Sequence, residues 1–474
     1  MREQDLPFDR RRAGVLLHVT SLPGGPVPSG TSTGDLGDEA YRFVDFLAAA
    51  GCSVWQVLPL VPTHPGDGSP YNAPSAMAGN TALISRRHQS AHGLESAAAL
   101  DERQQDAFGA WCVAQADWLA PYVEFMAIRE TQDLAAWQSW PQPLRDREPA
   151  AVAEVVAPLA DRVQALRFEQ WVFAVQWERL RDYAASKGVL LFGDLPIFVS
   201  LDSADVWASR ESFQLDEQGH PFTVAGCPPD YFAADGQRWG NPHYDWDAMA
   251  ADGFGWWRRR IARQRELFDL VRIDHFRGFE AAWHVPAEAE TAREGQWVRG
   301  PGADLLSALV ETAGAGSLVA EDLGTITPEV EALLAQFGLP GMKVLQFAFD
   351  GERDNPYLPA RHGEQSVVYT GTHDNDTTLG WWEQLDEESR ERVRSSLADP
   401  TEPMPWALVR LALQSTARLS VIPAQDLLGL GSEGRMNTPG TADGNWDWQA
   451  PAGAFDDELA ARVRDLVAAA DRLV

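Results

Sequence analysis

Three carboxylates follow short apolar stretches of the sequence. Asp274 lies in VRIDHFRG, Glu321 in VAEDLG and Asp374 in TGTHDNDT. Taken singly, each acid is better explained as a helix cap or a turn residue. Two carboxyl groups on either side of a glycosidic bond can complete a reaction. One acts as nucleophile and the other as general acid and then base, through an oxocarbenium-like transition state. A third acid would stabilise the developing positive charge.

Arg272 lies two residues before Asp274, so on an extended strand both side chains point to the same face. A guanidinium beside the carboxylate keeps it ionised, as a nucleophile must be. Glu321 has no neighbouring cation in the sequence, and a less polar setting would raise its pKa for work as an acid. This chemistry requires neither metal nor cofactor. The sequence contains no cluster of metal ligands and no GxGxxG fingerprint, so none is predicted.

Eight short apolar runs predict the strands that position these acids. Several are apolar on both faces, as parallel strands covered by helices must be, and helical patterns lie between many of them. Together they predict a single catalytic (β/α)8 barrel over residues 1–474, with its site at the carboxyl ends of the strands. The runs are 14–19, 53–60, 189–197, 268–275, 317–323, 342–349, 366–373 and 419–428.

Two intervals between strands are longer than a single helix requires. Residues 61–188, between the second and third strands, are rich in Ala, Trp and Glu and predict an inserted helical subdomain. Residues 198–267 contain many Gly, Pro and Asp residues and predict a second, loop-rich insertion. Long insertions in a barrel usually lie where the loops build the site.

The net charge of -30 excludes classes of partner. Its electric field repels phosphate backbones and anionic lipids, so we do not expect nucleic acids or membranes as partners. A neutral ligand is expected instead.

Three widely spaced cysteines predict reduced thiols. The N-terminal residues show no apolar signal-peptide core, which predicts a cytoplasmic protein. The sequence does not indicate an oligomeric state.

The motifs together resemble those of the amylomaltases, or 4-α-glucanotransferases, which form glycoside hydrolase family 77. The similarity extends nearly end to end, through LLHVTSLPG, GDLPIFV, PPDYFAADGQRWGNPHY, VRIDHFRGF, GLPGMKVLQFAF, YTGTHDNDTTLGWW and RMNTPGTADGNW. It implies a retaining enzyme that moves maltooligosyl segments from one α-1,4-glucan to the 4-OH of another glucan or of glucose. Asp274 would be the nucleophile, Glu321 the acid/base and Asp374 the residue that holds sugar hydroxyls.

The resemblance also assigns binding residues. It implies that Arg272 orients Asp274, that His373 bonds the sugar and that Asp194 supports the site. Tyr71 matches an SPY element near the cleavage point, and Asn445 matches a residue that reaches the cleft after the last strand.

Segment 228–242 resembles a loop that covers the acceptor side of the cleft in this family. Flat aromatic faces there can stack on pyranose rings, although packing of the loop on the barrel explains each aromatic equally well. The aromatic residues are Tyr231, Phe232 and Trp239. The hydroxyls of a sugar also need donors and acceptors, a role open to Gln237, Asp230 and Asn241.

One motif departs from the family, and two alternatives stay open. His64 and Pro65 stand where members often have an aromatic residue associated with a second glucan-binding groove, so that groove is not carried over to this chain. The same three acids would serve an α-amylase-like hydrolase, in which water replaces the sugar acceptor. A catalytically inactive glucan-binding barrel is the alternative from another class of protein.

Overall fold

The computed structural model describes residues 8–24, 33–229, 234–441 and 443–474. In these residues eight parallel strands form one sheet in the order β10-β11-β12-β1-β2-β3-β6-β9. The two end strands approach one another, because the Ala320 N–H at the end of β9 donates to the Pro340 carbonyl just before β10 at 2.9 Å. The sheet is therefore a nearly closed (β/α)8 barrel, and the predicted fold class is confirmed.

Each of the eight predicted runs overlaps a strand of this barrel, although β1 begins two residues and β10 one residue before its predicted run. The strands are β1 (Arg12–Leu16), β2 (Val54–Gln56), β3 (Leu190–Pro196), β6 (Leu270–Asp274), β9 (Leu318–Ala320), β10 (Gly341–Val344), β11 (Ser366–Tyr369) and β12 (Leu419–Pro423). They are buried on both faces because the barrel interior lies on one side and the helices lie on the other. Phe192 packs in the interior cluster, whereas its neighbour Leu191 packs in the outer one.

The barrel helices follow the local signals of the sequence. In α1 (Asp38–Ala49), Ala40, Phe43, Val44 and Leu47 are buried at helical spacing. Helix α12 (Pro328–Phe337) begins after Thr327 with proline in its first turn and ends at Gly338 in the left-handed conformation. The remaining helices associated with the later strands are α11 (Ala303–Ala313), α13 (Thr378–Gln384), α14 (Glu387–Ser395), α15 (Trp406–Gln414), α16 (Ala424–Leu427) and α17 (Asp457–Ala469).

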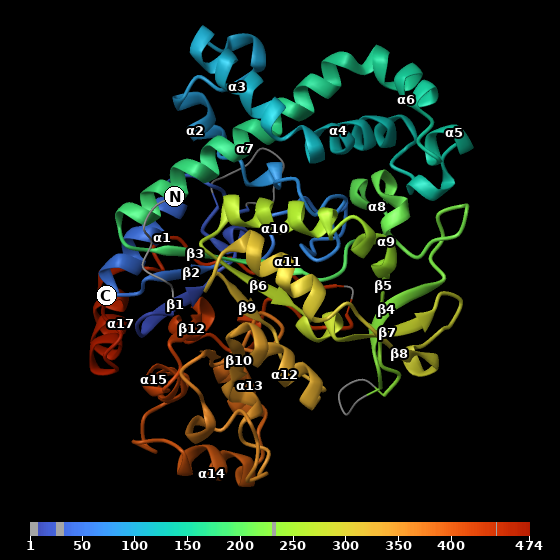
Figure 1. Cartoon of the computed structure of the whole chain (residues 1–474). Coiled ribbons are helices and arrows are strands. Elements are labelled where there is room, and N and C mark those ends of the chain that lie inside the picture. Colours follow the sequence, from blue (N-terminus) through green and yellow to red (C-terminus); the bar gives the residue numbers. More distant parts are fainter. Residues whose placement is uncertain (1–7, 25–32, 230–233, 442) are drawn as a thin grey trace.

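Between β2 and β3 the described chain is mainly helical. Figure 1 shows α2 to α6 gathered above the barrel, with the long helix α7 leading back to β3. This group contacts the rest of the chain chiefly through α7, which packs on α1, and through α4, which packs on α8. The helices are α2 (Arg86–Ala91), α3 (Glu102–Ala114), α4 (Ala116–Thr131), α5 (Gln142–Arg145), α6 (Pro149–Val156) and α7 (Ala160–Ser186).

A four-stranded antiparallel sheet, which was not predicted from the sequence, lies at one side of the barrel (Figure 1). Its order is β5-β4-β7-β8, and its strands are β4 (Thr223–Cys227), β5 (Gln237–Pro242), β7 (Ala281–Pro286) and β8 (Gln296–Arg299). Segment 198–267 also contains α8 (Ala204–Ala208), α9 (Trp246–Ala251) and α10 (Gly255–Leu267). The sheet joins residues from either side of β6, a pairing that a local pattern cannot reveal.

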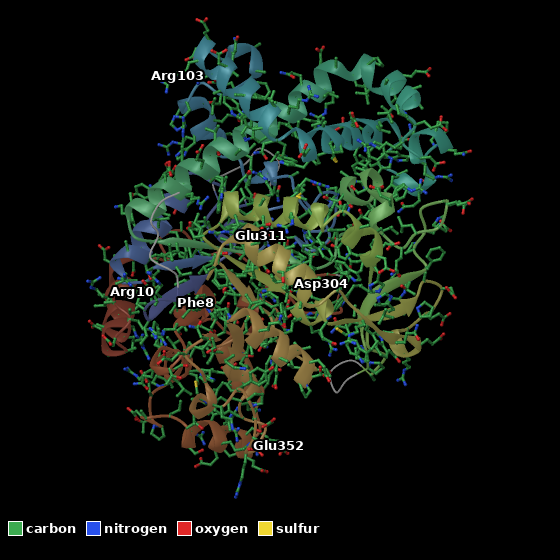
Figure 2. The ribbon with its side chains drawn as sticks, viewed as in Figure 1. Phe8, Arg10, Arg103, Asp304, Glu311 and Glu352 are labelled. Carbon is green, nitrogen blue, oxygen red and sulfur yellow. The ribbon has the colours of Figure 1, made fainter. Side chains whose placement is uncertain are left out.

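Charged side chains cover the outside of the barrel helices. Figure 2 shows Asp304 and Glu311 on α11, and Glu311 pairs with Arg258 of α10 at 2.7 Å. Cys52, Cys112 and Cys227 do not form disulfides with one another in the described part of the chain. No helix in the described part of the chain is both long and apolar enough to cross a membrane.

Candidate active site

The three acids lie at the carboxyl ends of their strands. Asp274 is the last residue of β6, Glu321 directly follows β9, and Asp374 lies in the loop after β11. The strands are parallel members of one barrel, so these ends share one rim. Glu321 is buried, whereas the side chains of Asp274 and Asp374 are 27% and 43% exposed. A molecule at this rim therefore meets Asp274 and Asp374 before it meets Glu321.

Arg272 bridges two carboxylates inside the barrel. Its Nη1 donates to Oδ2 of Asp194 at 2.6 Å, and its Nη2 donates to Oδ1 of Asp274 at 2.7 Å. Asp194 faces Arg272 because the two residues are register partners of β3 and β6. Arg272 is buried, and the negative charges around it raise its pKa well above the usual range. The guanidinium is therefore a fixed positive charge beside Asp274.

The carboxyl groups of Asp274 and Glu321 differ in their enclosure and in their bonding to Arg272. Burial raises the pKa of Asp274 to about 6, although the Arg272 guanidinium opposes this rise. Burial raises the pKa of Glu321 to about 8, since Glu321 is more deeply enclosed and Arg272 bonds Asp274 instead. Backbone N–H groups of His275 and Leu323 hold the two Glu321 oxygens, at 2.7 and 2.9 Å. Between these two pKa values Asp274 is ionised while Glu321 carries a proton.

Tyr71 connects Asp194 to the third acid. Its hydroxyl lies 2.6 Å from Oδ2 of Asp194 and 2.9 Å from Nε2 of His373. A hydroxyl that donates to Asp194 accepts from His373, which requires the proton on Nε2. Burial lowers the pKa of His373, so its ring is neutral near pH 7. The same Nε2 lies 3.3 Å from Oδ1 of Asp374, and the rings of Tyr71 and His373 stack at 5.3 Å.

Three residues beside Asp374, His373 and Tyr71 were not predicted from the sequence. Asn437 donates from Nδ2 to Oδ1 of Asp374 at 2.6 Å, and Arg435 donates to the Asp374 carbonyl at 2.7 Å. The Trp446 ring lies 5.8 Å from that of Tyr71 and 6.0 Å from that of His373. All three lie in or next to the RMNTPGTADGNW stretch. This family motif was therefore found in the sequence, but it did not indicate which of its side chains reach the site.

The side chain of Asn445 makes hydrogen bonds within its own loop. Its Oδ1 accepts from the Thr438 N–H at 2.8 Å, and its Nδ2 donates to the Thr441 carbonyl at 3.0 Å. These bonds fold the segment that presents the neighbouring Trp446 ring to Tyr71. Asn445 is half-buried, and within the described residues its side-chain hydrogen bonds join it to this loop rather than to the three acids.

The predicted covering segment is described in part. Asp230, Tyr231 and Phe232 lie outside the described residues. Trp239 is 38% exposed, and its ring lies 4.9 Å from that of His275, the residue after Asp274. Gln237 accepts from the Trp239 indole N–H at 3.1 Å, and Asn241 donates to the Val199 carbonyl at 2.9 Å. An exposed indole thus stands beside the strand end that carries Asp274.

No group of three or more His, Cys, Asp or Glu side chains in the described ranges could hold a metal ion. Several of the polar groups at the rim bond one another or the backbone. Arg272 has one carboxylate on each side, and both oxygens of Glu321 accept backbone N–H groups.

A (β/α)8 barrel with an arginine-held carboxylate and a buried acid at its rim belongs structurally with the barrel enzymes that act on glycosidic bonds. The sequence profile of the family described as 4-alpha-glucanotransferase matches residues 17–101 and 88–454. A Thermus thermophilus 4-alpha-glucanotransferase is 47% identical over 98% of this chain and 99% of its own length. A chloroplastic/amyloplastic 4-alpha-glucanotransferase of Solanum tuberosum is 43% identical over 98% of this chain and 87% of its own.

Solved structures agree with the sequence matches. The amylomaltase from Streptococcus agalactiae, solved in complex with acarbose, has a TM-score of 0.93 and 34% identity, over 98% of this chain and all of that one. The amylomaltase of Corynebacterium glutamicum, at 18% identity and a TM-score of 0.77, shares the fold over 98% of this chain and 76% of that one. The chain therefore belongs to the 4-α-glucanotransferase family, glycoside hydrolase family 77, and is a glycosyl-transferring enzyme.

Proposed function

We propose that the enzyme moves maltooligosyl segments between α-1,4-glucans by a retaining double displacement, with Asp274 as nucleophile and Glu321 as acid and base. The observation that carries this proposal is the difference between the two carboxyl groups. Asp274 is ion-paired with Arg272, whereas Glu321 is buried and has a pKa raised to about 8. Of the two, Asp274 is therefore the anion and Glu321 the proton donor near pH 7.

In the first step, Oδ2 of Asp274 attacks C1 of a donor glucose, because Oδ1 is held by Arg272. The bond from C1 to the leaving oxygen breaks, and Glu321 gives its proton to that oxygen. The products are a covalent glucosyl ester on Asp274 and a shortened glucan with a free 4-OH. Asp374, held by Asn437 and beside His373, would bond the hydroxyls of the sugar at this position.

In the second step, the 4-OH of another glucan or of glucose attacks C1. Its proton passes to Glu321, the ester bond breaks, and Asp274 leaves as a carboxylate. Two inversions at C1 preserve the α configuration. No residue changes its net charge over the cycle, so the enzyme returns to its starting state.

Transfer competes with hydrolysis at the ester intermediate. Water and a sugar hydroxyl are alternative nucleophiles there, and a covered acceptor side favours the sugar. The exposed Trp239 ring beside His275 supports a sugar-stacking position on that side.

The cytoplasmic location inferred from the N-terminal sequence stays a prediction, as does the division of the chain into a barrel with insertions at 61–188 and 198–267.

Incubation with maltotriose tests the proposal. We expect glucose together with a ladder of longer maltodextrins, each with a new α-1,4 bond in the proton NMR spectrum. Asp274→Asn and Glu321→Gln should abolish the ladder while the circular dichroism spectrum stays unchanged. Exclusively shorter products would indicate a hydrolase, and full activity in either variant would refute the assigned roles.

A further inference from the structure

The chain turns at His275, immediately after the strand that carries Asp274. His275 has φ 51° and ψ 47°, which is the left-handed conformation. For a residue other than glycine this conformation is unfavourable, and Asn is among the few residues that adopt it easily. Such strain persists only where the surrounding structure holds it.

The turn directs two successive N–H groups at Glu321. The His275 N–H donates to Oε2 of the side chain at 2.7 Å, and the Phe276 N–H donates to the backbone carbonyl of Glu321 at 3.2 Å. Successive amides converge on one acceptor region when a turn includes a left-handed residue. The strained conformation therefore ties the end of β6 to the residue that follows β9.

The His275 ring is packed between two segments. The Trp239 ring stands edge-on to it at 4.9 Å with an interplanar angle of 88°. On another side, a Cβ added at Gly278 would lie 3.3 Å from Cδ2 of His275, so the ring fits closely over this glycine. Nε2 is buried and has no hydrogen-bond partner among the described residues. Burial, followed by the nearby Arg277, lowers the pKa of the ring to about 4, so it is neutral near pH 7.

We propose that His275 is a positioning residue for Glu321. Its left-handed turn aims a backbone N–H at the carboxyl group, and the contact between its ring and Trp239 joins that turn to segment 228–242. This inference rests on the proposed role of Glu321 as acid and base. The charges of Arg272 and Asp274 act on the pKa of Glu321, and the charge of Glu321 acts on the pKa of Tyr357.

Paired substitutions at position 275 separate the turn from the ring. His275→Asn and His275→Val both remove the imidazole. Asparagine adopts the left-handed conformation readily, whereas the β-branched valine does not. We expect the asparagine variant to keep most of the maltotriose activity and the valine variant to lose about tenfold or more, the typical contribution of a well-placed acid being at least 100-fold. If the valine variant does not fold, His275→Ala provides the same comparison.

The pH dependence gives a readout that a purely structural role would not move. The His275 N–H favours the ionised form of Glu321 and so lowers its pKa. Loss of this bond should therefore shift the alkaline limb of the kcat profile to higher pH in the valine variant, but leave it in place in the asparagine variant.

An activated donor supplies a second readout. Fluoride leaves α-maltosyl fluoride without needing a proton from Glu321. In a single turnover, the valine variant should release fluoride at nearly the wild-type rate although it transfers poorly from maltotriose. A general folding defect would lower both rates.

The coupling between the His275 ring and Trp239 is measured with Trp239→Ala, His275→Asn and the double variant. The effects of the two substitutions on kcat should not be additive.

The outcomes separate this inference from the proposed function. If the valine, alanine and asparagine variants share one kcat and one alkaline limb while Glu321→Gln is inactive, the positioning role is wrong and the proposed function stands. Additive effects of the Trp239 and His275 substitutions would refute the link to segment 228–242. Wild-type activity in Glu321→Gln would refute both proposals.

Discussion

Arg272 donates a 2.7 Å hydrogen bond to Asp274, two residues further along the same strand. The opposite end of its guanidinium bonds Asp194 at 2.6 Å, so one buried cation separates two carboxylates. A planar fork can make both bonds at once, which a lysine ammonium on a flexible stem cannot do with the same geometry. The Asp274 carboxylate is thereby fixed in orientation as well as in charge.

We expect Arg272→Lys to lower kcat for maltotriose transfer by about 100-fold, because an ammonium group cannot bond Asp194 and Asp274 with the same geometry and a small misplacement of a reacting group can cost about 100-fold. Arg272→Ala should be worse. The matched control is Arg394→Ala, which breaks an exposed pair with Glu387 on α14. Exposed pairs contribute little, so that variant should keep its activity and melting temperature. An unchanged kcat in the Arg272→Lys variant would exclude a role for the arginine fork.

The pH–rate profile should be bell-shaped. Activity rises as Asp274 ionises, with a pKa raised to about 6, and falls as Glu321 loses its proton, with a pKa raised to about 8. The two groups interact, so the limbs report the pair. Measurement of kcat from pH 4 to 10 with maltotriose tests this expectation. A profile that keeps rising beyond roughly pH 9 would contradict the role of Glu321 as proton donor.

Stability should depend on pH through Glu321. Its folded-state pKa lies above its unfolded value, so the folded protein binds the extra proton and stability declines as pH rises from about 4.5 through about 8. Glu321→Gln removes this titration. At pH 9 the variant should therefore melt at a higher temperature than the wild type, and at pH 4 the difference should shrink. Equal melting temperatures at both pH values would contradict a strongly shifted Glu321.

Substitutions at Asn437 probe how Asp374 is held. Asn437→Ala removes a 2.6 Å bond to Oδ1, and we expect kcat to fall about tenfold, in line with the roughly 1.5–3 kcal/mol of a hydrogen bond to a charged group. Asn437→Asp should cost more at pH 8, because two carboxylates would face each other. Equal kcat values for the two variants across the pH range would refute this repulsion.

Asp426 fixes the loop that carries His373 and Asp374. It is 1% exposed and accepts hydrogen bonds from Thr370 Oγ1, Thr378 Oγ1 and the Thr378 N–H, at 2.5, 2.6 and 2.7 Å. Asp426→Ala leaves these donors buried without partners. We expect the free energy of unfolding to fall by about 3 kcal/mol or more. Asp399→Ala is the control, since Asp399 makes similar bonds to Thr401 in an exposed turn. Similar urea midpoints for both variants would contradict this account.

The sequence by itself determined the barrel and the rim on which the acids lie. Apolar runs without alternation indicate strands covered on both sides, and residues two apart on a strand share a face. The prediction that Arg272 and Asp274 lie together therefore needed no tertiary information. Family motifs added the expectation that Asp374 holds sugar hydroxyls, and the class of enzyme. These signals are local, and each depends on neighbours within one strand or one loop.

The tertiary structure alone decided which distant segments meet. Tyr71 touches Asp194 and His373 because the loops after β2 and β11 meet over strand β3 when the barrel closes. The same closure brings Asn437 to Asp374 and the His275 N–H to Glu321. In the second sheet, β4 pairs directly with β7 although β6 lies between them in the sequence. Such contacts depend on the curvature of the sheet and on loop geometry, which the pattern of any single segment does not contain. The separation of the two key pKa values follows from that enclosure, since burial is a property of the folded chain.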